Sequence, residues 1–456
     1  MLTRRGFAFG AATTVMMTGL DGLSAAKTEP ELRLGVVSDV HSMFDTWLSA
    51  LRYFAAHNVD AVVVSGDMID GGREWELRRF MDIWNKVFPD GKGPDGRPVE
   101  KLFVYGNHDE EGWRYGTDKK KLEDPVFLAK CITPERKAAL WNDIVGEAYQ
   151  PIWMKRVRGY QFIGSHWSES AKIGDYLKVH AAEIDRGKPF FYIQHRHPSG
   201  TCIGPWAWGH DKGESTSALK DYPNAVVFSG HSHYTLTDER SVWQGAFTSI
   251  NAGSLQYAST DYSLRENATG GGSYGYKETS RGRAMAGLDT KNGRHGLLVS
   301  VSDGRLVIER RNFADGTPSG EDWIVPVPPD GSYAFERRAA SRVAPEFSAD
   351  AVVTFERKDK LLFVNFPAAK TVKGCRVFEY EVTATLIEDQ VDLVQAQRRV
   401  FSRSFHLAER SDQPAESCAF KLDELKAKGH YVFSVRPIEC FGRKGLPISA
   451  SIDICA

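Results

Sequence analysis

Short apolar runs, nearly free of polar residues, recur between residues 32 and 230 of this chain. Runs of roughly four to eight residues that lack polar alternation are typical of strands buried on both faces. Five runs predict such strands: LRLGVVS (32–38), DAVVVSG (60–66), KLFVYG (101–106), PFFYIQ (189–194) and NAVVFSG (224–230).

Two segments between these runs have apolar residues at helical spacing. Residues 73–88 place Leu77, Phe80 and Trp84 on one face, and residues 44–58 behave in the same way. Strands that alternate with helices predict a layered α/β unit. Four shorter strand-like runs with turns between them predict a second sheet, at residues 158–165, 247–254, 295–302 and 305–313.

The composition changes after this α/β unit, which we place at residues 31–313. Residues 314–345 are rich in Pro, Gly and Asp and predict a linker. Residues 346–456 contain alternating strand-like runs, which favour a small β-sandwich of the immunoglobulin or fibronectin kind. Within that domain, KLDELKAKG (421–429) predicts a helix.

The first 26 residues have the layout of a signal peptide. Arg4 and Arg5 precede a weakly apolar run that ends in small residues, and the paired arginines resemble the bacterial twin-arginine signal. A membrane anchor is the alternative, but the run is shorter than the ~20 residues that a membrane span needs. We therefore expect export by the twin-arginine machinery to the periplasm or medium, with no transmembrane anchor in the mature protein.

Charge and cysteine usage exclude some classes of function. The 58 basic and 59 acidic residues give a formal net charge of −1, so no general attraction to nucleic acid is expected. None of the six cysteines has the CxxC spacing of a zinc site. A cysteine-ligated metal is therefore not expected.

Carboxylate, amide and imidazole side chains stand directly after all five predicted strands. Because sites form at the carboxyl ends of strands in α/β sheets, we expect these groups to meet. Oxygen and nitrogen ligands without thiolate suit Mn, Fe or Zn. Seven such groups are too many for one ion and suit two ions that share a carboxylate. They are Asp39, His41, Asp67, Asn107, His195, His231 and His233.

The order of these motifs resembles that of a known family. Asp-x-His, Gly-Asp-x-x-Asp, Gly-Asn-His-Asp, His and Gly-His-x-His occur in series over residues 31–312. This series is similar to that of the calcineurin-like metallophosphoesterases, and it matches the motif set of class III cyclic-nucleotide phosphodiesterases. The resemblance implies a four-layer sandwich, in which helices flank two mixed β-sheets, with a dinuclear metal centre at one edge.

The resemblance also implies a role for each residue. One metal would be held by Asp39, His41 and His233, the other by Asn107, His195 and His231, with Asp67 between the two. The implied reaction is phosphoester hydrolysis by water that the metals activate. His108 would face the phosphate and protonate or stabilise the leaving oxygen, and Asp109 would orient the His108 ring.

The chain departs from the family pattern at two positions. The fourth motif of the family usually has its histidine two residues before a proline, and here that position is Arg196, between His195 and His197. We favour His195 as the ligand because it directly follows the strand, and His197 is the alternative. Asp70 stands where the purple acid phosphatase branch has a tyrosine ligand, so an iron–tyrosinate site is not expected.

The sequence indicates less about the organic groups of the substrate than about its phosphate. Candidate substrate-binding residues follow the fourth motif: Arg196, His197, Trp206, Trp208 and His210. We favour a small-molecule or cell-envelope phosphodiester, because the tryptophans offer apolar surface for a second ester group. The alternatives are a phosphomonoesterase or nucleotidase, and a surface or glycan-binding protein whose phosphoesterase domain is vestigial.

Overall fold

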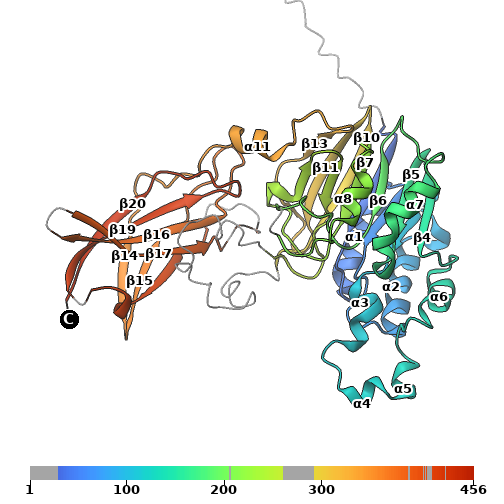
Figure 1. Ribbon diagram of the computed structural model, residues 1–456, viewed down its shortest axis with the longest axis horizontal. Coiled ribbons are helices and arrows are strands. Elements are labelled where there is room, and N and C mark those ends of the chain that lie inside the picture. The colour runs from blue at the N-terminus through green and yellow to red at the C-terminus, as the bar shows by residue number, and fades with distance from the viewer. Residues whose placement is uncertain are drawn as a thin grey trace, which may run out of the picture.

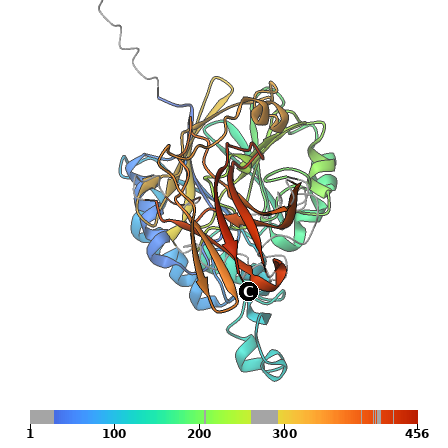
Figure 2. The same ribbon diagram turned by 90° about the vertical axis from the view of Figure 1, so that its left-hand side faces the viewer.

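The computed structural model describes residues 29–204, 207–259, 292–388, 391–403, 405, 407, 413–426 and 428–455. An α/β part comes first in the chain and an all-β part follows it (Figure 1). Seen from the side of the all-β part, its strands lie in front of the α/β part (Figure 2). In the described residues no helix has the length and apolar character that crossing a bilayer requires.

The α/β part contains two mixed sheets. The seven-stranded sheet has the order β12-β11-β10-β1-β2-β3, with β13 also paired to β11. Its strands are β1 (Leu32–Val37), β2 (Ala61–Ser65), β3 (Glu100–Val104), β10 (His295–Ser302), β11 (Arg305–Asn312), β12 (Thr317–Pro318) and β13 (Trp323–Pro326). The six-stranded sheet has the order β4-β5-β6-β7-β9-β8. Its strands are β4 (Ile152–Val157), β5 (Tyr160–Ser165), β6 (Phe190–Ile193), β7 (Ala225–Ser229), β8 (Val242–Gln244) and β9 (Thr248–Asn251).

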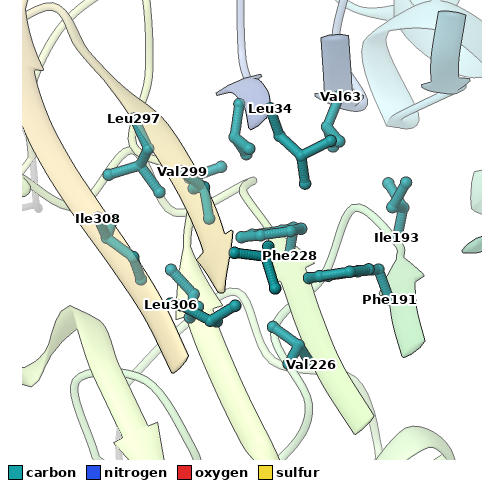
Figure 3. Close-up of a cluster of buried hydrophobic side chains, with 14 of the residues drawn as sticks. Leu34, Val63, Phe191, Ile193, Val226, Phe228, Leu297, Val299, Leu306 and Ile308 are labelled. Carbon is teal, nitrogen blue, oxygen red and sulfur yellow. The ribbon is translucent and has the colours of Figure 1, made fainter. Parts of the chain in front are cut away.

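The inner faces of the two sheets pack on each other and form an extensive apolar contact (Figure 3). Side chains of both sheets meet there: Leu34, Val63, Leu297 and Val299 from one, and Phe191, Ile193, Val226 and Phe228 from the other. Because helices also cover the outer faces, the central strands are buried on both sides. That double burial is the reason for their continuous apolar sequences.

Helices cover the outer face of each sheet. The bounds of the helices in this part are α1 (Phe44–Ala56), α2 (Glu74–Val87), α3 (Asn107–Glu111), α4 (Lys119–Leu122), α5 (Pro125–Leu128), α6 (Lys137–Leu140), α7 (Ile173–Val179) and α8 (Glu214–Leu219). Helices α1 and α2 pack on the seven-stranded sheet, where Trp47 stacks on Phe80 with ring centroids 4.5 Å apart. Helices α7 and α8 pack on the six-stranded sheet. The expected four-layer sandwich is therefore confirmed.

The segment that we expected to be a linker contains regular structure. Strand β13 pairs with β11, because Trp323 and Val325 alternate with exposed residues and bury their side chains against the sandwich. It is followed by helix α11 (Phe335–Ser341), whose Arg338 donates to a carboxylate oxygen of Glu239 over 2.8 Å. Residues 314–345 are therefore more ordered than their Pro/Gly-rich composition indicates.

The C-terminal part is a pair of antiparallel sheets that enclose their own apolar core. One sheet consists of β14 (Thr354–Lys358), β15 (Leu361–Phe366) and β18 (Glu416–Lys421), and the other of β16 (Glu379–Glu388), β17 (Val391–Phe401), β19 (Gly429–Ile438) and β20 (Ile448–Ile454). The helix expected at 421–429 is wrong. A single 3-10 turn, Leu422–Glu424, follows β18, because Leu425 turns into the core and β18 pairs with β15.

Candidate metal centre

The carboxyl ends of strands from both sheets meet at one edge of the sandwich. Strands β1, β2 and β3 are parallel neighbours, and so are β6 and β7. The two sheets contact each other here through Asp39, which accepts the backbone N–H of His231 over 2.8 Å. His195 makes a second contact, 2.7 Å from the Ser65 carbonyl oxygen.

Unusual backbone conformation is concentrated at this edge. Of the thirteen described non-glycine residues with positive φ, five are expected metal ligands: Asp39, His41, Asp67, His231 and His233. Such conformations cost about 1–3 kcal/mol each and persist where the surrounding structure imposes them. Their concentration at the ends of β1, β2 and β7 is a structural sign of a functional site.

Two glycines allow these strand ends to approach each other. A Cβ on Gly106 would lie 2.2 Å from Asp67 Oδ1, and one on Gly230 would lie 1.8 Å from Ser38 Oγ. Both positions therefore exclude every residue with a side chain. The glycine in each Gly-Asn-His-Asp and Gly-His-x-His motif serves this close packing.

One group of ligand atoms is formed by Asp39, His41 and His233, which have the burial and spacing of a metal site. His233 Nε2 lies 3.1 Å from Asp39 Oδ1 and 3.1 Å from His41 Nε2. Two imidazole nitrogens at this separation need a proton or a cation between them, because their lone pairs repel.

A second group is formed by Asp67, His195 and His231. His195 Nε2 lies 3.0 Å from Asp67 Oδ2, 3.2 Å from His231 Nδ1 and 3.1 Å from the Asn107 amide oxygen. Asp67 Oδ2 also lies 3.3 Å from His41 Nε2, so this one oxygen touches both groups.

Hydrogen bonds on the far side of the rings set which nitrogen faces the cluster. Carbonyl and ionised carboxylate oxygens only accept, so Nδ1–H of His195 donates to Ser65 O and Nδ1–H of His41 donates to Asp70 Oδ1. Both rings therefore present an unprotonated Nε2 to the cluster when they are neutral. This is the arrangement by which outer partners orient metal-binding histidines.

The pKa shifts of the buried side chains indicate that the cluster needs positive charge. Burial alone would raise the pKa of Asp67, but His195 and His41 hold it well below its usual range. In turn, burial would lower the pKa of His195, but Asp67 and Asp39 raise it to about 9. Asp39 Oδ1 is buried, and the groups that approach it are ring nitrogens of His233, His41 and His195. Divalent cations would supply the missing charge in place of these protons, so the donor set fits metal ions.

The ring of His108 lies beside the cluster, and its partner differs from the expected one. Its Nδ1 lies 2.8 Å from the Asp70 carbonyl oxygen and 3.1 Å from Asp70 Oδ1. Burial would lower the pKa of His108, but Asp70 raises it. We expected Asp109 to orient this ring, and Asp70 takes that place instead.

Asp109 has a structural position. Its buried carboxylate accepts the backbone N–H groups of Gly106 and Ile69 over 2.6 and 3.1 Å. Burial and the neighbouring Asp67 raise its pKa to about 8. Asp109 therefore ties the turn after β3 to the turn after β2.

Two expected substrate-binding histidines hydrogen bond with other parts of the chain. His197 is fully buried, with its ring nitrogens 2.7 Å from Ser229 Oγ and 2.6 Å from Ser232 Oγ. His210 Nε2 lies 3.1 Å from the Cys202 carbonyl oxygen. Hydrogen bonds occupy these rings, which indicates a structural role, and their role in binding substrate stays a prediction.

Of the other expected substrate-binding residues, the structure describes Arg196 and Trp208. The Arg196 guanidinium stacks on Trp167 at 3.4 Å from the ring centroid, which limits its reach toward a substrate. Trp208 is 39% exposed, with its ring centroid 5.1 Å from that of His231. Trp206 lies outside the described residues.

Three aromatic residues beside the cluster were missed by sequence reasoning. Trp167 contacts the His195 and His231 rings, Tyr115 contacts His108, and Tyr257 contacts His233. A signal existed for Trp167, because it follows β5, whose carboxyl end lies at the same edge as that of β6. Tyr115 and Tyr257 lie in turns with no comparable pattern.

Part of the chain matches a known protein family. Residues 32–235 match the family model described as calcineurin-like phosphoesterase. No curated protein sequence matches the chain significantly.

Several solved structures are similar to this chain at low sequence identity. A dimetal phosphatase from Danio rerio is 11% identical, with a TM-score of 0.37 over 66% of this chain and 100% of its own. The protein TT1561 of Thermus thermophilus is 13% identical, with a TM-score of 0.36 over 62% of this chain and 99% of its own. A phosphoesterase from E. coli, Yfce, is 13% identical, with a TM-score of 0.29 over 65% of this chain and 100% of its own. These likenesses are too distant to bear on the reaction.

Proposed function

We propose that residues 32–235, which match the calcineurin-like phosphoesterase model, form a metallophosphoesterase domain, and that the protein is an exported phosphodiesterase that uses two transition-metal ions. The observation that carries the proposal is the position of Asp67 Oδ2, 3.3 Å from His41 Nε2 and 3.0 Å from His195 Nε2. A panel of phosphoesters, assayed on protein whose metal content is measured, tests the proposal.

The ligand atoms divide into two sets around Asp67. We assign one ion to Asp39, His41 and His233, and the other to Asn107, His195 and His231, with Asp67 shared. Mn, Fe and Zn suit such nitrogen and oxygen donors. When bound, divalent ions lower the pKa of a coordinated water and neutralise the phosphoryl oxygens.

We assign proton transfer and the orientation of the ligands to side chains around the metal ions. Asp70 holds the His108 ring through Nδ1, which leaves Nε2 available to hold a proton for the leaving oxygen. The Asn107 amide is positioned by its Nδ2–H group, which donates to the Tyr115 hydroxyl over 3.2 Å. Asp109 keeps the two strand ends in register.

The charge of the site favours a diester over a monoester. A monoester carries about two negative charges at neutral pH, and a diester carries one. Within the described ranges, no Lys or Arg side chain forms a hydrogen bond or ion pair with the seven proposed ligands. Arg196 is the nearby candidate, and it is stacked on Trp167.

We therefore predict a higher kcat/KM for bis(p-nitrophenyl) phosphate than for p-nitrophenyl phosphate under the same metal and pH. A clear preference for the monoester would replace this proposal with a phosphomonoesterase or nucleotidase. Hydrolysis of neither ester by fully metal-loaded protein would instead favour a surface or glycan-binding protein with a vestigial phosphoesterase domain.

The choice between His195 and His197 gives a paired prediction. His195→Ala should lower the bound metal of the folded protein severely, because His195 Nε2 contacts ligand atoms of three neighbours. His197→Ala should keep most of the metal and lower the melting temperature, because it removes the ring that hydrogen bonds with the Ser229 and Ser232 hydroxyls. Elemental analysis and thermal unfolding check both. Metal loss confined to His197→Ala would reverse the assignment.

Export rests on residues outside the described ranges. We propose that Arg4 and Arg5 direct the folded chain through the twin-arginine machinery. Replacing both with lysine should leave the precursor in the cytoplasm, as measured by cell fractionation. An unchanged yield in the periplasm would count against this route.

A further inference from the structure

Exposed aromatic side chains gather around the candidate metal centre. Four are strongly exposed in the described part of the chain: Trp75 at 61%, Tyr115 at 47%, Trp208 at 39% and Tyr257 at 37%. Three of these four lie against a histidine of the centre, although they come from three different segments. We call Tyr115, Trp208 and Tyr257 the aromatic rim.

Each rim residue contacts a different histidine. The Tyr115 ring centroid is 4.9 Å from that of His108, near the end of the short turn after α3. Trp208, in the loop between β6 and β7, is 5.1 Å from His231. Tyr257, which follows β9, is 4.3 Å from His233.

Contacts with the histidine rings explain where these three aromatic rings lie. They do not explain why the rings are exposed to solvent. Exposed apolar surface beside a polar site is typical of surfaces that contact a ligand. The buried rings at the same edge show the contrast: Tyr234 is 1% exposed, and its hydroxyl hydrogen bonds with the backbone of Trp208. The rim residues instead leave more than a third of each side chain open to solvent.

We propose that the aromatic rim binds the organic groups of the substrate, and that the ester group retained after cleavage carries a planar ring, as a nucleobase or aryl group does. The inference rests on the proposed phosphodiesterase function. His108 is assigned to the leaving oxygen, so Tyr115 faces the leaving group. Trp208 and Tyr257 lie beside His231 and His233 and are left for the retained group. Aromatic side chains bind planar rings by stacking, which requires no particular hydrogen-bond pattern.

Three esters that share one leaving group test the proposal. Phenyl, cyclohexyl and methyl p-nitrophenyl phosphate all release p-nitrophenolate, so they differ in the retained group. Wild-type protein should show the highest kcat/KM for the phenyl ester. In Trp208→Ala, the ratio of kcat/KM for the phenyl ester to that for the methyl ester should fall roughly fivefold or more. Trp208→Phe should restore much of that ratio, because it keeps an aromatic face.

Two controls separate ring binding from damage to the centre. Trp75→Ala removes the one strongly exposed described aromatic that lies outside the rim, and the ratio should not change. Bound metal should equal the wild-type value in Trp208→Ala and Tyr257→Ala, since neither residue is a ligand.

The possible results distinguish a failure of the rim proposal from a failure of the proposed phosphodiesterase function. Equal losses on phenyl and methyl esters in Trp208→Ala, or equal wild-type rates for phenyl and cyclohexyl esters, would overturn the stacking role while phosphodiester hydrolysis stands. No hydrolysis of any of the three by metal-loaded wild-type protein would overturn the proposed function itself.

Discussion

Asp67→Ala is expected to remove nearly all phosphoester hydrolysis and most of the bound metal. Asp67 Oδ2 contacts His41 Nε2 and His195 Nε2, which belong to different ligand groups, and Oδ1 accepts the His108 backbone N–H over 2.8 Å. One substitution thus affects both proposed ions and the start of helix α3, which carries His108. Loss of outer partners of a metal site typically costs about 10–100-fold, so loss of a shared ligand should exceed that range.

Thermal unfolding adds a readout that does not depend on activity. A chelator should lower the melting temperature of wild-type protein, because ions that bind the folded state stabilise it. The same chelator should change the melting temperature of Asp67→Ala much less, since that variant holds little metal.

Asp60→Asn is the matched control. Asp60 is also buried and directly precedes β2, at the opposite end from Asp67, where it accepts the Arg33 N–H and pairs with Arg97. That variant should lose stability and keep its metal.

A measurement of at most one ion per chain in active wild-type protein would contradict the dinuclear assignment.

His108→Ala is expected to lower turnover by about 10²–10⁴-fold while bound metal stays near the wild-type value. The His108 ring contacts Asp70 and has no hydrogen bond to the ligand atoms around Asp67 Oδ2 in the described residues. His231→Ala should lose metal as well as activity, because His231 Nδ1 lies 3.2 Å from His195 Nε2 inside the second group.

His180→Ala serves as the control for both histidine variants. His180 follows α7, far along the chain from these motifs, and pairs with Glu183. It should change neither turnover nor metal. An empty site in His108→Ala together with a loaded site in His231→Ala would falsify the division of roles.

Much of the α/β fold could be predicted because its cause is local. Residues 61–64 and 225–228 are apolar without interruption, and the structure buries both strands on both faces. Strand β13 and the 421–429 segment were predicted wrongly for one reason. Trp323 is buried by pairing with β11, and Leu425 by the core between the two sheets of the C-terminal part, so neither outcome follows from the local sequence alone.

The sequence by itself determined which chemical groups stand at the strand ends, because a strand followed by Gly and then by Asp, Asn or His is a local pattern. The tertiary structure decided which side chains share a partner. It placed His195 in the cluster and His197 among serine hydroxyls, and it put Asp70 beside His108. Side-chain neighbours depend on which strands and turns pack together, and that information is spread over segments that the linear pattern does not connect. The aromatic rim is the extreme case, because its three residues meet only where three separate turns meet one edge of the sandwich.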